Sequence, residues 1–373
     1  LQAGDVERLR AMGPAHLRVN IDLTGAEWRD RLAFAAAEAG ALGAALEVEL
    51  QTGAEGQGAA EFFRAAKDVG VPLARVLAFP AGKLVTTAAV MNAVLAARDA
   101  AGVPTPVGGG SRAFFSEWNR AAADLPLGKM ELAGFPVNPT VHAIDNASLA
   151  ETLAAQPATV ASARAIVGAM PIAVGPVTFR MPFNPNATGP APEPAPGTLP
   201  ATVDERQPSL FGAAWTAGSI GRLAGAGAAS LTFFQTNGWR GVMERSDHPL
   251  RVPGFHSWPG MTFPLYHVLA DAMEFAGGEL LALSTSDGLA LDGFAVRTDG
   301  RTRVVLANLT DGPVAVGAEL PAGTARLRAL DERSFRQAGS DPAGFRAAWS
   351  DAPGGGAQAL TIGPCGVVTI DIG

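Results

Sequence analysis

The chain has 373 residues, of which 48% are hydrophobic and only 17% are charged, and its formal net charge is −7. This length exceeds that of one ordinary domain and suits one large domain joined to a small one. The sequence holds no cluster of Lys and Arg and no apolar run of the roughly 20 residues that a membrane span needs, so we expect neither nucleic acid nor a membrane as a partner.

The first two-thirds of the chain repeat one pattern, in which a helix-like stretch ends in Ala and Gly and a short apolar strand follows. Glycine ends helices readily because it adopts the left-handed conformation without a Cβ clash. Such alternation indicates parallel strands joined by crossover helices. Seven strands are expected, at 16–21, 45–50, 73–79, 105–109, 130–137, 171–179 and 229–234, with an amphipathic helix at 149–167 before the sixth.

A closed barrel of this type needs eight strands. A helix expected at 5–12 precedes the first strand, and in a barrel a helix in that place follows an earlier strand. We therefore expect residues 1–278 to form a TIM-like (β/α)8 barrel that lacks its first strand and holds strands two to eight. An open seven-stranded sheet is the alternative. The Pro-rich stretch 183–200 follows a strand end, which favours an active-site loop over a linker.

A different pattern begins near Gly277, where short strands alternate with turn residues. Asp299 and Gly300 stand between two of these strands, and an Asp-Gly pair supplies the positive φ angles of a tight hairpin. Six strands are expected, at 280–284, 293–297, 303–309, 314–316, 325–329 and 367–372. We expect residues 279–373 to form a C-terminal antiparallel β-sandwich.

Polar residues gather after the expected strands, which is where active sites of barrel enzymes lie. Asn119, Asn138, Gln235 and Arg240 are candidates for hydrogen bonding to a substrate, and Trp118 and Trp239 are candidates for an apolar platform beside it. The full set of candidate substrate-binding residues is Asp22, Glu49, Trp118, Asn119, Asn138, Asp145, Arg180, Asn184, Gln235, Trp239 and Arg240. Helix capping is the alternative role of Asp22 and Asp145.

Glu117 and His142 are the candidate catalytic residues. Glu117 is flanked by Phe114, Phe115 and Trp118, and apolar neighbours raise the pKa of a carboxyl group toward the range of a general acid or base. His142 directly follows a strand, and histidine exchanges protons near neutral pH. The alternative for Glu117 is an ion pair with a nearby arginine, either that of residue 120 or that of residue 112.

Glu47 and Glu49 alternate with apolar residues, so both side chains point to one face and into the barrel. Two buried carboxylates need partners. Either they belong to the site or they pair with barrel arginines such as Arg18 and Arg75, and the sequence leaves both readings open.

Several other chemistries lack their sequence signals. No G-x-S-x-G elbow, P-loop, dinucleotide fingerprint or H-E-x-x-H motif occurs. Asp247, His248 and His256 do not have the spacing typical of zinc ligands, so we expect no metal and no cofactor. Cys365 is the one cysteine, and its apolar surroundings favour an inert thiol. A lone cysteine gives no sign of an oxidising compartment, so we expect a cytoplasmic protein.

Five segments resemble the bacterial D-apionate lactonase family: Asn-Pro-Thr-Val-His-Ala-Ile-Asp at 138–145, Phe-Asn-Pro-Asn-Ala-Thr at 183–188, Asp-Glu-Arg-Gln-Pro-Ser-Leu-Phe at 204–211, Gly-Trp-Arg-Gly at 238–241 and Phe-Pro-Leu-Tyr-His-Val at 263–268. The resemblance covers nearly the whole chain. It implies an N-terminal β domain, which this sequence would lack together with the first barrel strand, then a TIM-like barrel and a C-terminal β-sandwich. It also implies hydrolysis of D-apionolactone, a small sugar lactone, to D-apionate in apiose breakdown.

Three functions are therefore weighed. The preferred one is a sugar-lactone hydrolase, in which Glu117 activates water and His142 protonates the leaving oxygen or exchanges roles with it. The alternative is a glycoside hydrolase that uses Glu49 and Glu117 as paired carboxylates. The expected last strand ends in Gln235, whose amide is neither nucleophile nor base, and this disfavours glycosidic cleavage at that position. A sugar-binding protein without catalysis is the third.

Overall fold

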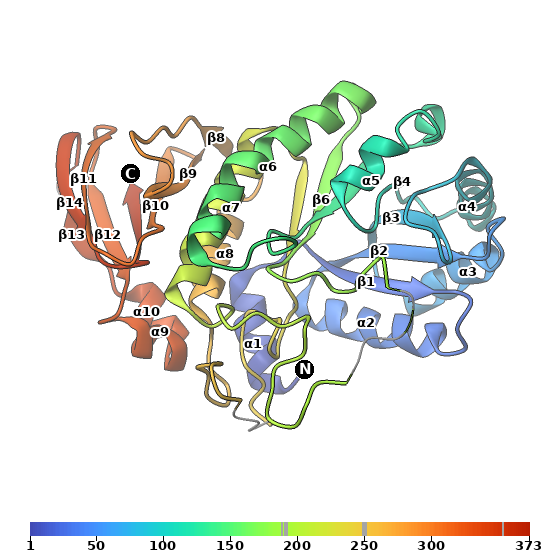
Figure 1. Ribbon diagram of the computed structural model, residues 1–373, viewed down its shortest axis with the longest axis horizontal. Helices are drawn as coiled ribbons and strands as arrows, with labels where there is room; N and C mark the ends of the chain where they lie inside the picture. The colour runs from blue at the N-terminus through green and yellow to red at the C-terminus, as the bar shows by residue number, and fades with distance from the viewer. Residues whose placement is uncertain (188, 190–192, 248–251, 353) are drawn as a thin grey trace.

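The computed structural model describes residues 1–373 except for 188, 190–192, 248–251 and 353. Figure 1 shows two lobes side by side. One is built on a parallel sheet with helices around it, and the other is built on antiparallel strands that include the C-terminal end of the chain. The chain thus follows the expected order of a helix-wrapped domain and then an antiparallel one.

The parallel lobe alternates strands and helices in chain order. Its strands are β1 (His16–Asp22), β2 (Ala45–Thr52), β3 (Leu73–Pro80), β4 (Val107–Gly110), β5 (Ala133–Val137), β6 (Ile172–Val177) and β7 (Ser230–Phe233). Its helices are α1 (Ala3–Met12), α2 (Trp28–Leu42), α3 (Ala59–Val69), α4 (Ala88–Ala101), α5 (Phe115–Arg120), α6 (Asn146–Val167), α7 (Leu210–Gly225) and α8 (Pro264–Met273). The prediction of seven parallel strands is confirmed.

The seven strands form one sheet in the order β1-β2-β3-β4-β5-β6-β7. β1 and β7 are its edges, and no ladder joins them within the part of the chain that the structure describes. The sheet nevertheless curves so far that side chains of the two edges meet, since His16 Nε2 lies 2.7 Å from Thr232 Oγ1. The lobe is therefore a TIM-like near-barrel.

The strand register decides what faces the interior of the near-barrel. Arg18 of β1 lies opposite Glu47 of β2, and Asn20 lies opposite Glu49. On the neighbouring strand β3, Leu77 and Phe79 belong to a separate apolar cluster with Leu132 and Ala173. The interior consequently has a charged side toward β1 and β2 and an apolar side toward β5 and β6.

Strand β4 consists largely of glycine, and this brings its backbone close to its neighbours. A Cβ atom on Gly108 would collide with the carbonyl oxygen of Leu132, and one on Gly109 would collide with the side chain of Thr86. Thr86 Oγ1 donates to the carbonyl oxygen of Ala78 at 2.7 Å and accepts from the backbone N–H of Gly110 at 3.0 Å. These contacts fix the loop that leaves β4 at the mouth of the near-barrel, which is the end where the carboxyl ends of the strands lie.

The second lobe is an antiparallel sandwich, as predicted. Its strands are β8 (Glu279–Leu281), β9 (Leu291–Thr298), β10 (Arg301–Asn308), β11 (Val314–Leu320), β12 (Ala325–Leu330), β13 (Ser350–Ala352), β14 (Gly356–Ile362) and β15 (Val367–Ile372). Six of them form one sheet in the order β13-β12-β15-β10-β9-β8, and β11 pairs with β14 in a second sheet. The division of the chain at residue 278 remains our proposal.

The sequence did not predict β13, β14 or the helices α9 (Phe335–Ser340) and α10 (Pro342–Ala347). β14 is rich in Gly and Ala and buries few of its side chains, so its hydrophobic pattern is weak. Each of the two helices has only 6 residues, which is less than two turns. A helical repeat of apolar residues does not show over so short a segment.

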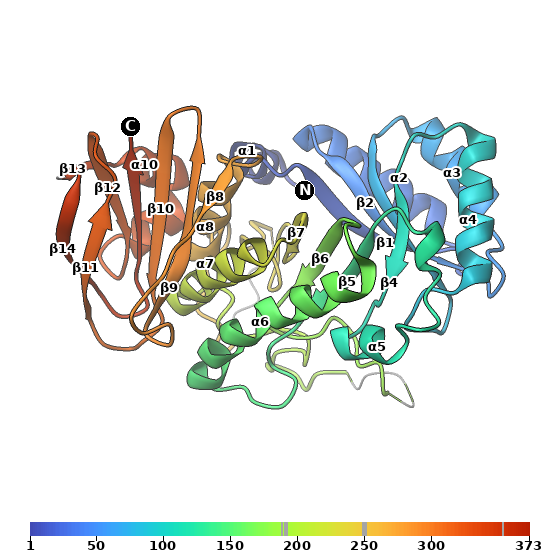
Figure 2. The same ribbon diagram turned by 90° about the horizontal axis from the view of Figure 1, so that it is seen from above.

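The two lobes meet where α7 and α8 lie against the antiparallel lobe (Figure 2). The carboxylate of Asp271 in α8 is the centre of a buried ion cluster at this interface. It accepts two hydrogen bonds from Arg328 at 2.6 and 2.8 Å, one from Arg346 at 2.7 Å and one from Thr369 at 2.7 Å. Arg303 lies 3.6 Å from it and pairs with Asp371 at 2.6 Å. Charged groups, and not only apolar packing, therefore hold the lobes together.

His267 lies one helical turn before Asp271 and is fully buried, and this burial lowers its pKa to about 3. Its Nε2 donates to the carbonyl oxygen of Ala338 in α9 at 3.0 Å. His267 therefore joins the two lobes as a neutral imidazole at neutral pH.

We expect the protein to lose stability as the pH falls below neutrality. An unfolded chain protonates histidine below about pH 6.5, whereas folded His267 takes up a proton only near pH 3. The unfolded state consequently binds more protons in this window, and the free energy of unfolding falls as the pH falls through it. Thermal melts between pH 7 and pH 5 check this. A His267→Gln variant should show a shallower decline, and an equally steep decline in that variant would contradict the assignment.

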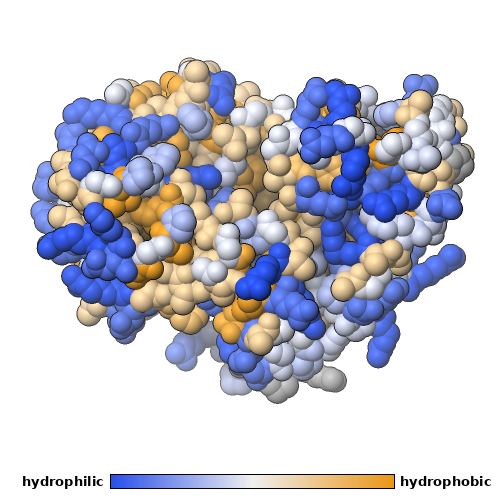
Figure 3. All heavy atoms as spheres, turned by 180° about the vertical axis from the view of Figure 1, so that it is seen from behind, coloured by the Kyte–Doolittle hydropathy of each residue, from blue (hydrophilic) through white to orange (hydrophobic). Residues whose placement is uncertain are grey.

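Figure 3 shows the face opposite to Figure 1, where hydrophobic residues gather in small patches between hydrophilic ones. Among the described residues, no helix is both long and apolar enough to cross a membrane.

Candidate active site

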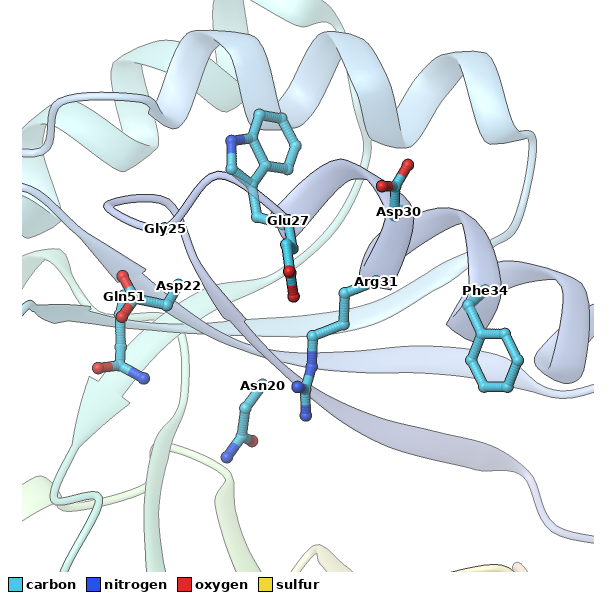
Figure 4. A pocket seen from close by; sticks show the side chains of 9 residues that line it. Asn20, Asp22, Gly25, Glu27, Asp30, Arg31, Phe34 and Gln51 are labelled. Atoms are coloured by element: carbon cyan, nitrogen blue, oxygen red, sulfur yellow. The ribbon is translucent and has the colours of Figure 1, made fainter. Parts of the chain in front are cut away.

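Two hollows open among the loops at the strand ends. The larger one, of about 580 Å³, lies beside the ends of β1 and β2 and the start of α2. Figure 4 shows that Asn20 and Gln51 project from the strands, while Arg31 reaches from α2 toward Asn20. Its lining residues are Asn20, Asp22, Gly25, Glu27, Trp28, Asp30, Arg31, Phe34 and Gln51. This hollow contains Asp22, one of the predicted site residues.

The second hollow, of about 300 Å³, lies at the end of β7. It brings together three predicted residues, Gln235, Trp239 and Arg240. Its lining residues are Pro200, Thr202, Val203, Gln235, Asn237, Gly238, Trp239, Arg240 and Arg245. The indole of Trp239 is half-buried and its ring centroid is 6.1 Å from that of Phe255, so one wall is aromatic and held in place.

Hydrogen bonds hold the loop that carries these residues. Some lie within the loop, and one comes from Gln207 in the segment before α7. The backbone N–H of Gln235 donates to the carbonyl oxygen of Arg240 at 2.9 Å, and that of Val242 donates to the carbonyl oxygen of Gln235 at 3.1 Å. Gln207 Nε2, which is buried, donates to the carbonyl oxygen of Gly241 at 2.7 Å. The loop is therefore shaped before any ligand arrives.

Glu47 and Glu49 are both buried in the near-barrel and both are paired with arginines. Arg18 donates to each of them at 2.6 Å, Arg75 lies 3.2 Å from Glu47, and Arg112 donates to Glu49 at 3.0 Å. Burial alone would raise the pKa of Glu47, but the charge of Arg18 and its neighbours holds that pKa below its ordinary value. Of the two readings that the sequence left open, the structure shows the pairing with arginines.

The network of ion pairs around Glu47 and Glu49 extends to Arg112 at the mouth of the near-barrel. Arg112, in the loop after β4, also donates to Gln51 Oε1 at 2.8 Å, and the ring of Phe183 lies 5.0 Å from its guanidinium carbon. Phe183 begins the Pro-rich segment that was expected to be an active-site loop. The interior charges thus position Arg112 beneath this segment.

Arg180, at the end of the β6 region, lies 3.0 Å from the carboxylate of Asp204. Asp204 also accepts hydrogen bonds from Arg206 at 2.7 and 2.8 Å. Burial opposes the charge of Asp204, but the bonds from Arg206 hold the pKa of this carboxyl below its ordinary value. Arg180 is therefore neutralised by the protein itself.

Asn138 and Asn184 have local partners. Asn138 Nδ2 donates to Thr178 Oγ1 at 2.8 Å, which joins the ends of β5 and β6. Asn184 Oδ1 accepts from the backbone N–H of Asn186 at 3.0 Å and shapes its own exposed turn. Neither residue lines the two hollows.

Glu117 lies on α5 and accepts a hydrogen bond from Arg120 at 2.5 Å. This ion pair is the alternative that the sequence offered for Glu117, and its catalytic role remains a proposal. Its neighbour Trp118 is fully buried and packs against Phe135, with ring centroids 5.5 Å apart. The indole of Trp118 thus belongs to the core and lines neither hollow, so the structure lends no support to its predicted role in an apolar platform.

His142 and Asn119 are exposed, and the structure gives neither side chain a partner among the described residues. His142 lies in the loop after β5 and Asn119 lies on α5, which follows the neighbouring strand β4. Neither lines the two hollows, and no hydrogen bond or ion pair joins His142 to Glu117 in the described part of the chain.

Asp145 performs its alternative role as a helix cap, whereas Asp22 caps no helix and instead shapes the turn after β1. Asp145 caps α6, accepting from the backbone N–H of Ser148 at 2.9 Å and from its hydroxyl at 2.7 Å. These bonds, that from the backbone first, lower the pKa of Asp145. Asp22 accepts from the backbone N–H and hydroxyl of Thr24 at 3.0 and 2.7 Å and still lines the larger hollow.

Asn20, Gln51, Thr202 and Asn237 are among the polar lining residues that were not candidates from the sequence. Two of them carry a readable signal from strand parity, because Asn20 alternates in step with Arg18 and Gln51 alternates in step with Glu49. Thr202 and Asn237 stand in irregular loops, where no periodicity applies.

No group of three or more His, Cys, Asp or Glu side chains that could hold a metal occurs in the described ranges. His248, one of the three residues weighed as zinc ligands, lies outside them.

Comparisons with known proteins agree with this architecture. The sequence model of the D-apionate lactonase TIM barrel domain matches residues 1–277, and that of the C-terminal immunoglobulin-like domain of D-apionate lactonase matches residues 289–370. The D-apionate lactonase of Brucella anthropi is 36% identical over 106 residues, which cover 28% of this chain and 17% of that protein.

Among solved structures, a GH30 endoxylanase from Clostridium papyrosolvens superposes with a TM-score of 0.60 at 13% identity, covering 100% of this chain and 93% of that one. A family 51 α-L-arabinofuranosidase from Bifidobacterium longum gives a TM-score of 0.60 at 11% identity, with 100% and 90% covered. Identities this low show a shared fold alone. Because both lactonase domain models match in order and the first spans most of the chain, the chain belongs to the D-apionate lactonase family.

Proposed function

We propose that this protein hydrolyses a sugar lactone, with D-apionolactone as its substrate, at the mouth of the near-barrel. The observation that carries the proposal is the composition of the second hollow. It offers the amide of Gln235, the hydroxyl of Thr202 and the guanidinium of Arg240 beside the indole of Trp239, and the amide of Asn237, whose Nδ2 also donates to Asp5 at 3.1 Å. Hydrogen-bond donors suit the hydroxyls and the carbonyl oxygen of a small lactone, and an aromatic wall suits its C–H face.

Lactone hydrolysis requires a base for water, donors for the oxyanion and an acid for the leaving alkoxide. The water oxygen bonds to the carbonyl carbon, the ring C–O bond breaks, and the alkoxide takes up a proton. The new carboxylic acid then loses its proton to solvent and becomes a carboxylate. No redox partner or second substrate is needed.

We assign the base to Glu117 and the acid to His142. They lie after β4 and β5, which are neighbours in the sheet, and outside the second hollow, which lies at the end of β7. Arg120, the partner of Glu117, is 72% exposed, and ion pairs at a surface are weak enough to open when a substrate binds. The ring of His142 is not tied to any described side chain and is available for proton transfer.

Glycosidic cleavage by Glu49 and Glu117 has less support. Glu49 is 3% exposed, and Arg18 and Arg112 each bind one of its two oxygens. A glycosidase carboxylate must contact either the anomeric carbon, a water or the leaving oxygen. Glu49 instead holds Arg112 in place.

The two reactions yield different products and can be compared directly. We expect the protein to convert D-apionolactone to D-apionate and to leave an apiosyl glycoside intact, as followed by proton NMR of each mixture. Release of free apiose from the glycoside, with no acceleration of lactone opening, would contradict the proposal.

A further inference from the structure

Arg240 differs from the other arginines of the described chain. It is half-buried in the second hollow, yet its guanidinium makes no hydrogen bond or ion pair with any described residue. Every other described arginine that is not exposed has a carboxylate or a backbone carbonyl as partner, as Arg18 has Glu47 and Arg8 has the carbonyl oxygen of Gly260. Burial without a partner also lowers the pKa of Arg240.

The missing counter-charge does not lie in the undescribed part of the chain, because none of those residues is Asp or Glu. Arg245 lines the same hollow and provides a comparison. Its guanidinium donates two hydrogen bonds to Asp247, each of 3.0 Å, so its charge is already neutralised. The hollow therefore contains one guanidinium that is paired with a carboxylate, that of Arg245, and one that is not, that of Arg240.

The backbone at Arg240 is also held in place by hydrogen bonds. Its carbonyl oxygen accepts from the backbone of Gln235, and the next residue, Gly241, accepts from Gln207. A Cβ atom on Gly241 would collide with the backbone of Asn237, so this close turn requires glycine. A half-buried arginine on a backbone turn that is already fixed requires little further ordering of that turn when an anion binds, which favours affinity.

We propose that the second hollow is a binding site for the carboxylate of an open-chain sugar acid, with Arg240 as the anchor. The inference rests on the proposed function, because lactone hydrolysis turns a neutral carbonyl into an oxyanion and then into a carboxylate on the same carbon. An unpaired guanidinium binds such an anion through paired hydrogen bonds and gains much less from the neutral lactone. The product therefore binds more tightly than the substrate and inhibits the enzyme.

Isothermal titration calorimetry with D-apionate tests the site. The expected result is saturable binding to the unaltered protein and a Kd that rises by at least roughly 10-fold in Arg240→Met, with Arg240→Lys between the two. Arg245→Met is the matched control, since it removes an equally long side chain from the same hollow. Its Kd should rise by much less than that of Arg240→Met, because Arg245 already has Asp247 as a partner.

The inference is overturned if the unaltered protein does not bind D-apionate, if Arg240→Met binds it unchanged, or if Arg245→Met loses as much affinity. Melting curves by circular dichroism establish that each variant is folded. Lactone turnover is measured separately, so that a failure of the proposed lactonase function can be distinguished from a failure of the carboxylate site at Arg240. Arg240-dependent binding without turnover sinks the proposed function and leaves the carboxylate site standing. Turnover with equal product inhibition in Arg240→Met and the unaltered protein sinks the site alone.

Discussion

Replacing Asp271 with Asn is expected to lower the free energy of unfolding by about 3–5 kcal/mol, the cost typical of breaking a buried ion pair by removing one partner. The carboxylate is 2% exposed, and Arg328, Arg346 and Thr369 all donate to it. The Asn side chain keeps one acceptor oxygen but leaves the charges of the arginines without their common partner. Urea unfolding followed by circular dichroism measures the loss.

Glu279→Gln is the control for this prediction. Glu279 pairs with Arg297 at 2.6 Å, but the two side chains are 64% and 51% exposed, so the substitution should cost less than about 1 kcal/mol. Equal losses in the two variants would show that burial does not decide the strength of these ion pairs, and the account of the interface would fail.

The second large effect concerns turnover. Glu117→Gln should reduce kcat for D-apionolactone by roughly 10²–10⁴-fold, which is the usual contribution of a general base. The amide keeps the size of the side chain and can still contact Arg120, but it cannot take a proton from water. Initial rates over a range of lactone concentrations separate a loss in kcat from a change in KM.

Arg120→Gln separates catalysis from local structure. It removes the ion pair of Glu117 but leaves the carboxylate, so a catalytic Glu117 predicts that this variant keeps most of its activity. If Arg120→Gln loses as much turnover as Glu117→Gln, the pair is structural. Asp22, which lines the larger hollow, would then be the next carboxylate to substitute.

Local sequence features predicted the architecture well. Most of the parallel strands combine an apolar run with a preceding helix that ends in glycine, as β1 to β4 do, and both signals are local in the sequence. The alternative roles of Glu117 and Asp145 were also readable, because their partners stand 3 residues away along the chain. The inward orientation of Glu47 and Glu49 followed from strand parity alone.

The parts that could not be predicted depend on distant segments. Arg112 reaches Glu49 from 63 residues further along the chain, because the glycines of β4 bring the next loop close to the mouth. Trp118 was a candidate for an apolar platform, but it is buried against Phe135 of β5, a contact that no local pattern indicates. The second hollow forms where residues 200–203 meet the loop after β7, so its shape is a property of the folded chain.

The central claim is that the mouth of the near-barrel opens a sugar lactone by attack of water on its carbonyl carbon. Turnover of D-apionolactone in ¹⁸O-labelled water, followed by mass spectrometry of the product, tests it most directly. The account predicts a saturable rate above spontaneous opening, with the label in the carboxylate of D-apionate. A rate no faster than the spontaneous one for the folded protein, or label found only in a hydroxyl group, would contradict it.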